Sequence, residues 1–196
     1  MRFEVKALDG NSFYEAIPVL AQLRIQIFRD WPYLYDGDFE YEQRYLKRFL
    51  EADRAFMAAA ICDGKIVGAA TAAPLAGEAE EFRAPFERAG YDTSKVFYFA
   101  ESLLIHEFRG QGIGHKFFDL REGHARSFGA FTHTCFCGVV RHENSPAKPK
   151  DYRPLNEFWE KRGYKMMPGL KTEYSWKDIG SSVETKKPMQ FWMAEL

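Results

Sequence analysis

The stretch that decides the fold is VFYFAESLLIHEFRGQGIG, residues 96–114. Its first ten residues form an aromatic and β-branched run interrupted by Glu101, which predicts a buried central strand over 96–105. Three glycines then predict a turn that opens a helix over about 112–127. Unpaired N–H groups and the dipole at a helix N-terminus attract anions, and glycine lets a phosphate approach the backbone. The stretch therefore predicts a phosphate or pyrophosphate site.

Other nucleotide-binding loops fit this stretch less well. The Walker pattern requires Gly-Lys followed by Ser or Thr, whereas here Gly114 precedes His115 and Lys116. The dinucleotide fingerprint Gly-x-Gly-x-x-Gly would need its third glycine one residue later. A glycine turn that binds no ligand is the remaining alternative.

Outward from this stretch, strand and helix patterns mix along the chain. The dipeptide Asp63-Gly64 predicts a tight hairpin between strands 55–62 and 65–73. Pro18 is awkward inside the first helix, so its start is expected near residue 17. The other expected strands are 2–8, 131–140, 164–168, 171–178 and 188–195, and the other expected helices are 39–53, 77–89 and 155–162. This order predicts one α/β domain on a mixed sheet.

Composition excludes several classes of function. The chain has 196 residues, enough for one domain, and a net charge of -1, so no strong field draws it to nucleic acid or anionic membranes. No apolar run approaches the length of a membrane span, and no signal-peptide core follows Met1, so a cytoplasmic protein is expected. Cysteines at 62, 135 and 137 suggest neither a disulfide framework nor a metal site.

Two motifs together resemble the GNAT superfamily of N-acetyltransferases. Arg109, Gly112 and Gly114 match its signature of Arg or Gln, two residues, Gly, one residue, and Gly or Ala after the fourth strand. The segment NEFWEKRGY, residues 156–164, is similar to the late helix of that family. The resemblance spans about residues 2–178 and implies a single domain over 1–196, with a mixed sheet splayed between its fourth and fifth strands.

The last residues, 184–196, extend past that core. Phe191 and Met193 alternate with Gln190 and Trp192, so this extension is expected to add an edge strand. If Phe191 and Trp192 are exposed, the alternative is a contact within a homodimer.

The resemblance implies an acetyl-CoA site in the splay and a direct attack by an amine on the thioester. Its pantetheine would pair with the backbone of Leu103, Leu104 and Ile105. Asn156 would lie near the thioester end. The residues implied for the pyrophosphate are Arg109, Gly110, Gln111, Gly112, Ile113 and Gly114.

The general base is expected to be Glu101, a charged residue inside an apolar strand. A regular strand would place it on the face of Phe99, and a bulge, which the family often has here, would turn it toward the splay. The alternative is that Glu101 pairs with an arginine or caps an element. The family often has a tyrosine as general acid where this chain has Trp159. Either Tyr152, Tyr164 or water substitutes for it, or no general acid is needed.

The resemblance implies that segments 31–42 and 141–152 build the acceptor side of the site. Asp36 and Asp38 lie among Tyr33 and Tyr41, a combination that suits an ammonium group, although acids at the start of a helix explain it equally well. The second segment offers Arg141, His142, Lys148 and Lys150 to a carboxylate on the acceptor, to the 3′-phosphate of CoA, or only to water. We therefore expect N-acetylation of a small primary amine. The alternatives are acetylation of a protein amine and an acyl-CoA-sensing module without turnover.

Overall fold

The computed structural model describes residues 3–196 and shows a seven-stranded sheet in the order β1-β2-β3-β4-β5-β7-β6. Only the β4–β5 pair is parallel. The strands are β1 (Phe3–Ala7), β2 (Phe56–Cys62), β3 (Lys65–Pro74), β4 (Val96–Leu104), β5 (His133–Val139), β6 (Lys165–Lys177) and β7 (Glu184–Glu195). The helices are α1 (Gly10–Phe28), α2 (Phe39–Leu50), α3 (Glu80–Arg88), α4 (Ile113–Ser127) and α5 (Asn156–Lys161), with short 3-10 turns η1 (Leu75–Gly77), η2 (Thr93–Lys95) and η3 (His106–Phe108). The expected α/β mixed sheet is confirmed.

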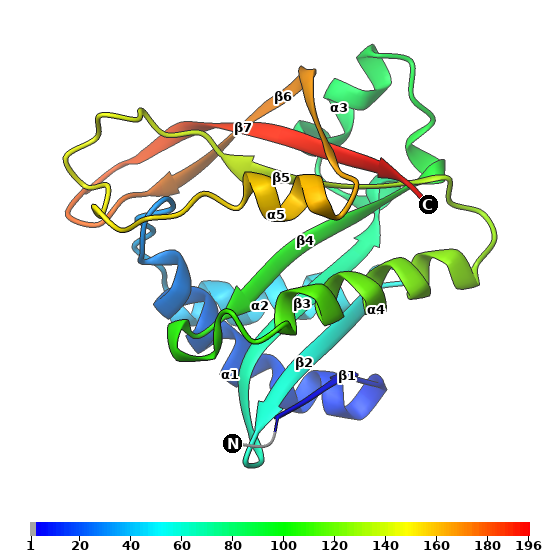
Figure 1. Cartoon of the computed structure of the whole chain (residues 1–196), viewed down its shortest axis with the longest axis horizontal. Coiled ribbons are helices and arrows are strands. Elements are labelled where there is room, and N and C mark those ends of the chain that lie inside the picture. Colours follow the sequence, from blue (N-terminus) through cyan, green and yellow to red (C-terminus); the bar gives the residue numbers. More distant parts are fainter. Residues whose placement is uncertain (1–2) are drawn as a thin grey trace.

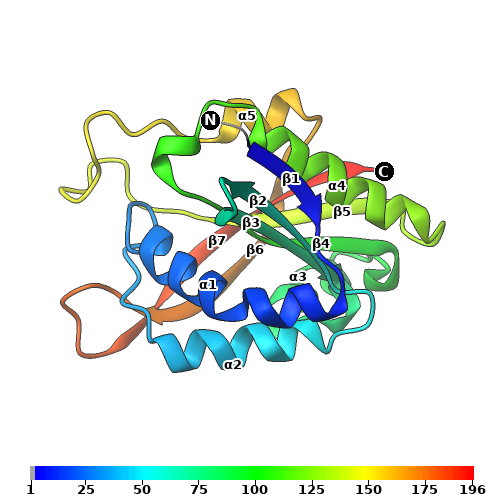
Figure 2. The same ribbon diagram turned by 90° about the horizontal axis from the view of Figure 1, so that it is seen from below.

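The helices cover the sheet from both sides, as Figure 2 shows with α1 and α2 below it and α4 and α5 above it. The lower layer buries Phe13, Leu20 and Leu46 against Met57 of β2. The upper layer packs Phe117 and Phe118 of α4 against the sheet. Among residues 3–196, no helix has the length and apolar character needed to cross a bilayer.

Local turn chemistry confirms one sequence prediction and corrects another. Asp63 and Gly64 both have positive φ, 47° and 78°, as the expected hairpin turn requires. The first helix, however, begins at Gly10 and continues through Pro18. The proline lies on the exposed side, where water can satisfy the carbonyl that its missing N–H leaves free, while Ile17 and Leu20 are buried. Burial of the apolar face thus outweighs the local cost of proline.

The C-terminal strand lies inside the sheet. β7 pairs with β5 on one side and with β6 on the other, so the expectation of an edge strand is wrong. Phe191 and Trp192 are 0% and 4% exposed, which removes the basis on which a dimer contact was expected there. The two strand pieces expected near 164–178 form the single strand β6, with a register shift between Met166 and Lys171.

The sheet opens between its two parallel strands. Only Val96–Tyr98 of β4 pair with His133–Cys135 of β5, after which the strands diverge (Figure 1). On its other side β4 bulges, because Ala70 of β3 faces Ser102 while Ala72 faces Phe99, so one extra residue lies on β4. The expected splay and the expected bulge are both present, and they meet at Ala100 and Glu101.

Candidate active site

The glycine loop presents a helix N-terminus at the open end of β4. Gly112 caps α4 with a left-handed φ of 80°, and Gly110 has a φ of 75°. Nothing lies within 4 Å of a Cβ built at either glycine, so backbone conformation, not crowding by the protein, demands glycine here. The first backbone bond of the helix runs from Lys116 N to Gly112 O at 3.3 Å, so the preceding N–H groups lack helical partners. Such a turn binds anions.

Side chains of the loop fix its course back to the strand. Arg109 Nε donates to Leu104 O at 3.2 Å, and Gln111 Nε2 donates to Glu107 O at 3.2 Å. The residues of β4 that follow Tyr98 do not pair with β5. The edge of β4 that contains Leu103 and Leu104 is therefore open toward the splay. The backbone expected to hold pantetheine therefore borders the glycine loop directly.

The late helix joins the glycine loop in space. The ring of Phe158 lies 3.3 Å from a Cβ built on Gly114 and 4.9 Å from the His115 ring, centroid to centroid. Arg162 anchors the end of α5 to α4 through Asp119 at 2.7 Å and Glu122 at 2.8 Å. Asn156, the first residue of α5, is exposed. The two sequence motifs thus build one region around the start of α4.

This combination of splay, bulge, glycine turn and late helix agrees with comparison to known proteins. The model of the acetyltransferase (GNAT) family matches residues 20–164. The chain belongs to this family. No curated protein matches it by sequence search.

Solved structures share the fold of this GNAT chain at low sequence identity. The ribosomal-protein-alanine N-acetyltransferase of Brucella melitensis has a TM-score of 0.64 at 12% identity, with 98% of this chain and 99% of that one covered. A putative acetyltransferase of Acinetobacter baylyi has a TM-score of 0.66 at 11% identity, covering 100% and 92%. Arabidopsis thaliana NAA60, solved with a bisubstrate analogue, has a TM-score of 0.63 at 15% identity, covering 99% and 98%. These similarities show the fold alone.

Glu101 lies in a closed polar network on the α1/α2 face. Tyr45 donates to its Oε1 at 2.9 Å, and Arg24 and Thr71 bind its two carboxylate oxygens. Its main-chain carbonyl accepts Arg121 Nη1 at 3.1 Å. Glu101 is 6% exposed. Because of the bulge in β4, its side chain lies on the face opposite to Phe99, where it contacts an arginine. Glu101 thus pairs with an arginine, which was the alternative to a general base in the sequence analysis.

Arg24 links this network to a second buried carboxylate. It binds Glu42, which is 0% exposed and also accepts the Tyr35 hydroxyl at 2.6 Å. Burial opposes the charge of Arg24, yet Glu101, Tyr45 and Glu42 together raise its pKa above the ordinary value. Arg24 is therefore a fixed cation that serves as the counter-ion of both Glu101 and Glu42.

The structure separates the expected proton donors. Tyr164 is 1% exposed, and its hydroxyl contacts Thr134 Oγ1 at 2.7 Å and Glu122 at 3.2 Å. Burial raises the pKa of Tyr164, so the structure argues against Tyr164 as the general acid. Tyr152 is half-buried with its ring 6.2 Å from that of Trp31, and burial raises its pKa while the charge of Arg109 opposes the rise.

Trp159 has a packing role in the structure. Its ring lies 4.9 Å from Phe136 and 5.1 Å from Trp192, and it covers Gly138. The side chain thus attaches α5 to β5 and β7. The position that often carries a tyrosine in the family is here part of the hydrophobic core.

The acids expected to bind the acceptor are already engaged. Asp38 caps α2 by accepting Tyr41 N at 2.7 Å, and Asp36 pairs with Lys177 at 3.1 Å and Arg29 at 3.6 Å. Tyr41 is 45% exposed on the outer surface. The alternative of acids at the positive end of a helix therefore describes Asp38, while Asp36 ties the loop to β6. His142 is exposed, and its Nδ1 accepts Asn144 N at 3.3 Å.

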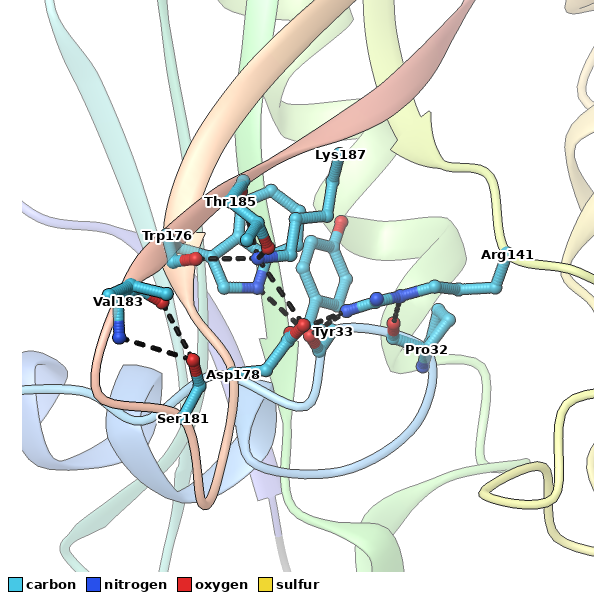
Figure 3. Close-up of polar contacts among 9 residues, drawn as sticks. All are labelled: Pro32, Tyr33, Arg141, Trp176, Asp178, Ser181, Val183, Thr185 and Lys187. Atoms are coloured by element: carbon cyan, nitrogen blue, oxygen red, sulfur yellow. Dashed lines mark hydrogen bonds and ion pairs between the residues drawn. The ribbon is translucent and has the colours of Figure 1, made fainter.

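Arg141 holds the loop 30–38 in place, as Figure 3 shows. It donates to Pro32 O at 2.8 Å, to Tyr33 O at 2.6 Å and to Asp178 at 2.9 Å. Burial disfavours the charge of Asp178, but Arg141 and Lys187 hold the pKa of that carboxyl below its usual value. The guanidinium of Arg141 is therefore bound to protein groups, whereas the sequence offered it to a substrate carboxylate, a CoA phosphate or water.

Three residues at the base of the splay were not among the site residues predicted from the sequence. The hydroxyl of Tyr98 on β4 lies 3.3 Å from Cys137 Sγ on β5, across the point where the strands part. Glu78 follows η1. Burial, then Cys137 and Glu78, raise the pKa of Tyr98, whereas burial and Glu78 raise the pKa of Cys137 against the opposing hydrogen bond from Tyr98. The sequence offers no signal for Glu78, since an acid at the start of helix 77–89 is ordinary.

Proposed function

We propose that this protein transfers an acetyl group from acetyl-CoA to the primary amine of a small molecule. The observation that carries the proposal is the glycine turn at the start of α4, which borders the unpaired edge of β4 in the splay. In this proposal the N–H groups of the turn hold the pyrophosphate, with Arg109 beside them, and the β4 edge pairs with pantetheine. Asn156 lies at the thioester end.

Bound acetyl-CoA supplies the activated acyl group, and the chain supplies orientation and proton transfer. Fixing both partners in the splay lowers the entropic part of the barrier. Of the two tyrosines considered as donors to the thiolate, we retain Tyr152, which lies near the charge of Arg109. Aromatic side chains on the α1/α2 face suit a cationic acceptor.

The test of the cofactor site compares substitutions at two glycines that have nearly the same positive φ. Gly112→Ala and Gly64→Ala both force alanine into a positive φ, 80° and 78°, with open space around the added Cβ. Each should cost about 1–2 kcal/mol of folding free energy. Only Gly112→Ala should also weaken acetyl-CoA binding, by roughly 10- to 100-fold, because its Cβ holds the phosphate away from the backbone N–H groups, whose hydrogen bonds contribute about 1.5–3 kcal/mol.

Thermal shift and calorimetry measure both effects. Acetyl-CoA at ~100 times its Kd should raise the Tm of the wild type by about 5–10 °C, corresponding to about 2.7 kcal/mol. Equal acetyl-CoA affinities for Gly112→Ala and Gly64→Ala would remove the glycine turn from the cofactor site. No shift in wild-type protein freed of copurified ligand would refute the proposed function itself.

A further inference from the structure

An aromatic wall lies at the base of the splay on the α1/α2 face. The ring of Phe82, in α3, lies 5.4 Å from Tyr98 of β4 and 5.4 Å from Tyr174 of β6. The Tyr98 hydroxyl then reaches Cys137 of β5 at 3.3 Å. Four elements therefore contribute to one surface beside the point where β4 and β5 part.

Glu78 places an unpaired carboxylate beside this wall. Its backbone is fixed at both ends, because its N–H donates to Leu75 O at 3.0 Å and its carbonyl accepts Arg83 Nε at 3.0 Å. The residue is half-buried, yet within residues 3–196 its carboxylate makes no hydrogen bond or ion pair. A partly buried carboxylate without a partner costs folding free energy unless a cation binds to it or a proton neutralises it.

Glu78 bonds through its N–H to Leu75, which is buried in one cluster with Tyr98, and Phe82 and Cys137 pack against that cluster. Its negative charge adds to burial in raising the pKa of Tyr98, Cys137 and Tyr45, residues of β4, β5 and α2. Burial and then the charge of Glu101 raise the pKa of Glu78 itself to about 7. The titratable and charged groups around it are Glu101, Tyr45, Tyr98, Cys135, Cys137 and Arg83, and Arg24 is bound to Glu101.

The other acids near the splay are unavailable. Both carboxylate oxygens of Glu101 bind protein groups, with Arg24 as the counter-ion. Glu42 shares the same arginine and is fully buried. Because Arg24 is already neutralised by these two acids, the carboxylate without a counter-ion in this region is Glu78.

We propose that Glu78 binds the ammonium group of the acceptor and takes its proton, while Glu101 anchors the β4 bulge. This inference rests on the proposed acetyl transfer. The ammonium gives one proton to the Glu78 carboxylate, and the neutral amine forms the C–N bond at the thioester carbon. When the C–S bond breaks, the electron pair leaves with sulfur and Tyr152 gives its proton to that thiolate. The second proton of the nitrogen then restores the Tyr152 hydroxyl. Glu78 then returns its proton to solvent.

This role predicts a cationic acceptor without a carboxylate next to the amine. The aromatic wall attracts an ammonium group by cation–π contact. A neighbouring carboxylate would face Glu78, and within residues 3–196 the cations of this region are already paired: Arg24 with Glu101, Arg83 with Glu87 and Arg141 with Asp178. The acceptor class is therefore an arylalkylamine or a polyamine, in preference to a free α-amino acid.

The experiment compares Glu78→Gln with Glu101→Gln and with Glu80→Gln, an exposed neighbour that serves as the matched control. Release of CoA from acetyl-CoA is followed with 2-phenylethylamine, spermidine and glycine as acceptors across pH 5.5–9.5, roughly spanning the pKa of a tuned base. Glu78→Gln should lower kcat by roughly 10²–10⁴ and lose the acid limb of the pH profile, with the acetyl-CoA thermal shift unchanged. Glu80→Gln should match the wild type.

The outcomes separate this inference from the proposed function. If Glu101→Gln loses the acid limb while Glu78→Gln keeps it, the assignment to Glu78 is overturned. If acetyl-CoA binds but no amine is acetylated, the proposed acetyl transfer is refuted. The role of Glu78 in binding the ammonium group is then tested by measuring amine affinity in the presence of CoA. Wild-type protein should bind 2-phenylethylamine at least tenfold more tightly than Glu78→Gln, and equal affinities would overturn the assignment.

Discussion

At the scale of single residues, the site is decided by which charges have counter-ions. Arg24 serves both Glu101 and Glu42, whereas Glu78 has no partner within residues 3–196. A buried carboxylate with a counter-ion remains charged at little cost, and one without a counter-ion is poised to accept a proton. Glu101 and Glu78 therefore differ in chemistry because of neighbours that are far away in sequence.

The raised pKa of Glu78 also predicts how stability depends on pH. Because burial and Glu101 raise it from 4.5 to about 7 in the folded protein, the folded state binds more protons than the unfolded state between these values. Its contribution to stability is present below the unfolded pKa and is lost as pH rises toward 7. Glu78→Gln removes this loss, so the variant should gain on the order of 1–3 kcal/mol relative to wild type between pH 5 and pH 8.

Urea unfolding at the two pH values measures this difference. The exposed Glu80→Gln should show a constant offset from wild type at both. A Glu78→Gln protein whose offset from wild type is the same at pH 5 and pH 8 would show that the carboxylate titrates in the ordinary range.

At the scale of elements, a cluster of ion pairs joins three segments that lie far apart in the chain. Lys187 is 3% exposed and contacts Asp178 at 3.3 Å and Thr185 Oγ1 at 2.7 Å. Asp178 also binds Arg141, which holds the carbonyls of Pro32 and Tyr33. The loop between α1 and α2 is thereby fastened to the β6–β7 hairpin and to the segment after β5, and in our proposal its position sets one side of the acceptor site.

Removing the guanidinium should loosen this loop without unfolding the domain. Arg141→Met leaves two carbonyls and Asp178 without their donor, at a cost of about 2–4 kcal/mol. Amide exchange should accelerate at Tyr35 and Asp36, whose N–H groups bond to Phe28 and Lys177, while the β2–β3 hairpin keeps its protection. The acceptor KM should rise while acetyl-CoA affinity holds.

Arg153→Met is the matched control, because Arg153 is exposed and makes no ion pair within residues 3–196. Equal exchange rates in the two variants at Tyr35 and Asp36 would mean that other contacts hold the loop.

At the scale of the whole molecule, β7 holds the two halves of the sheet together. Trp192 is 4% exposed and packs against Trp159, while Met166, its partner on β6, is 50% exposed. Trp192→Ala should cost about 3–5 kcal/mol of unfolding free energy, because it leaves a cavity between α5 and the sheet. Met166→Ala should cost less than about 0.5 kcal/mol.

Chemical denaturation of both variants measures the contrast. Similar losses for Trp192→Ala and Met166→Ala would show that the end of the chain is peripheral to the core, as its position after residue 178 suggested.

The sequence by itself determined the features that depend on neighbours within a few residues. Asp63 and Gly64 specify their hairpin because only certain residues tolerate positive φ, and the glycines at 110 and 112 specify the turn that opens α4 for the same reason. The central strand and its following helix, together with the segment at 156–164, were sufficient for the resemblance that the family match confirms.

Only the tertiary structure decided which side chains meet. β7 pairs with β5, about fifty residues before it, because a strand finds partners by burial and hydrogen bonding and not by order in the chain. Glu101 meets Arg24, 77 residues away, through a bulge that reverses its facing, and Asp36 and Asp38 satisfy a lysine and a helix end. Ion pairs are set by distances in space, which local pattern does not encode, so the free carboxylate of Glu78 was visible only in the folded chain.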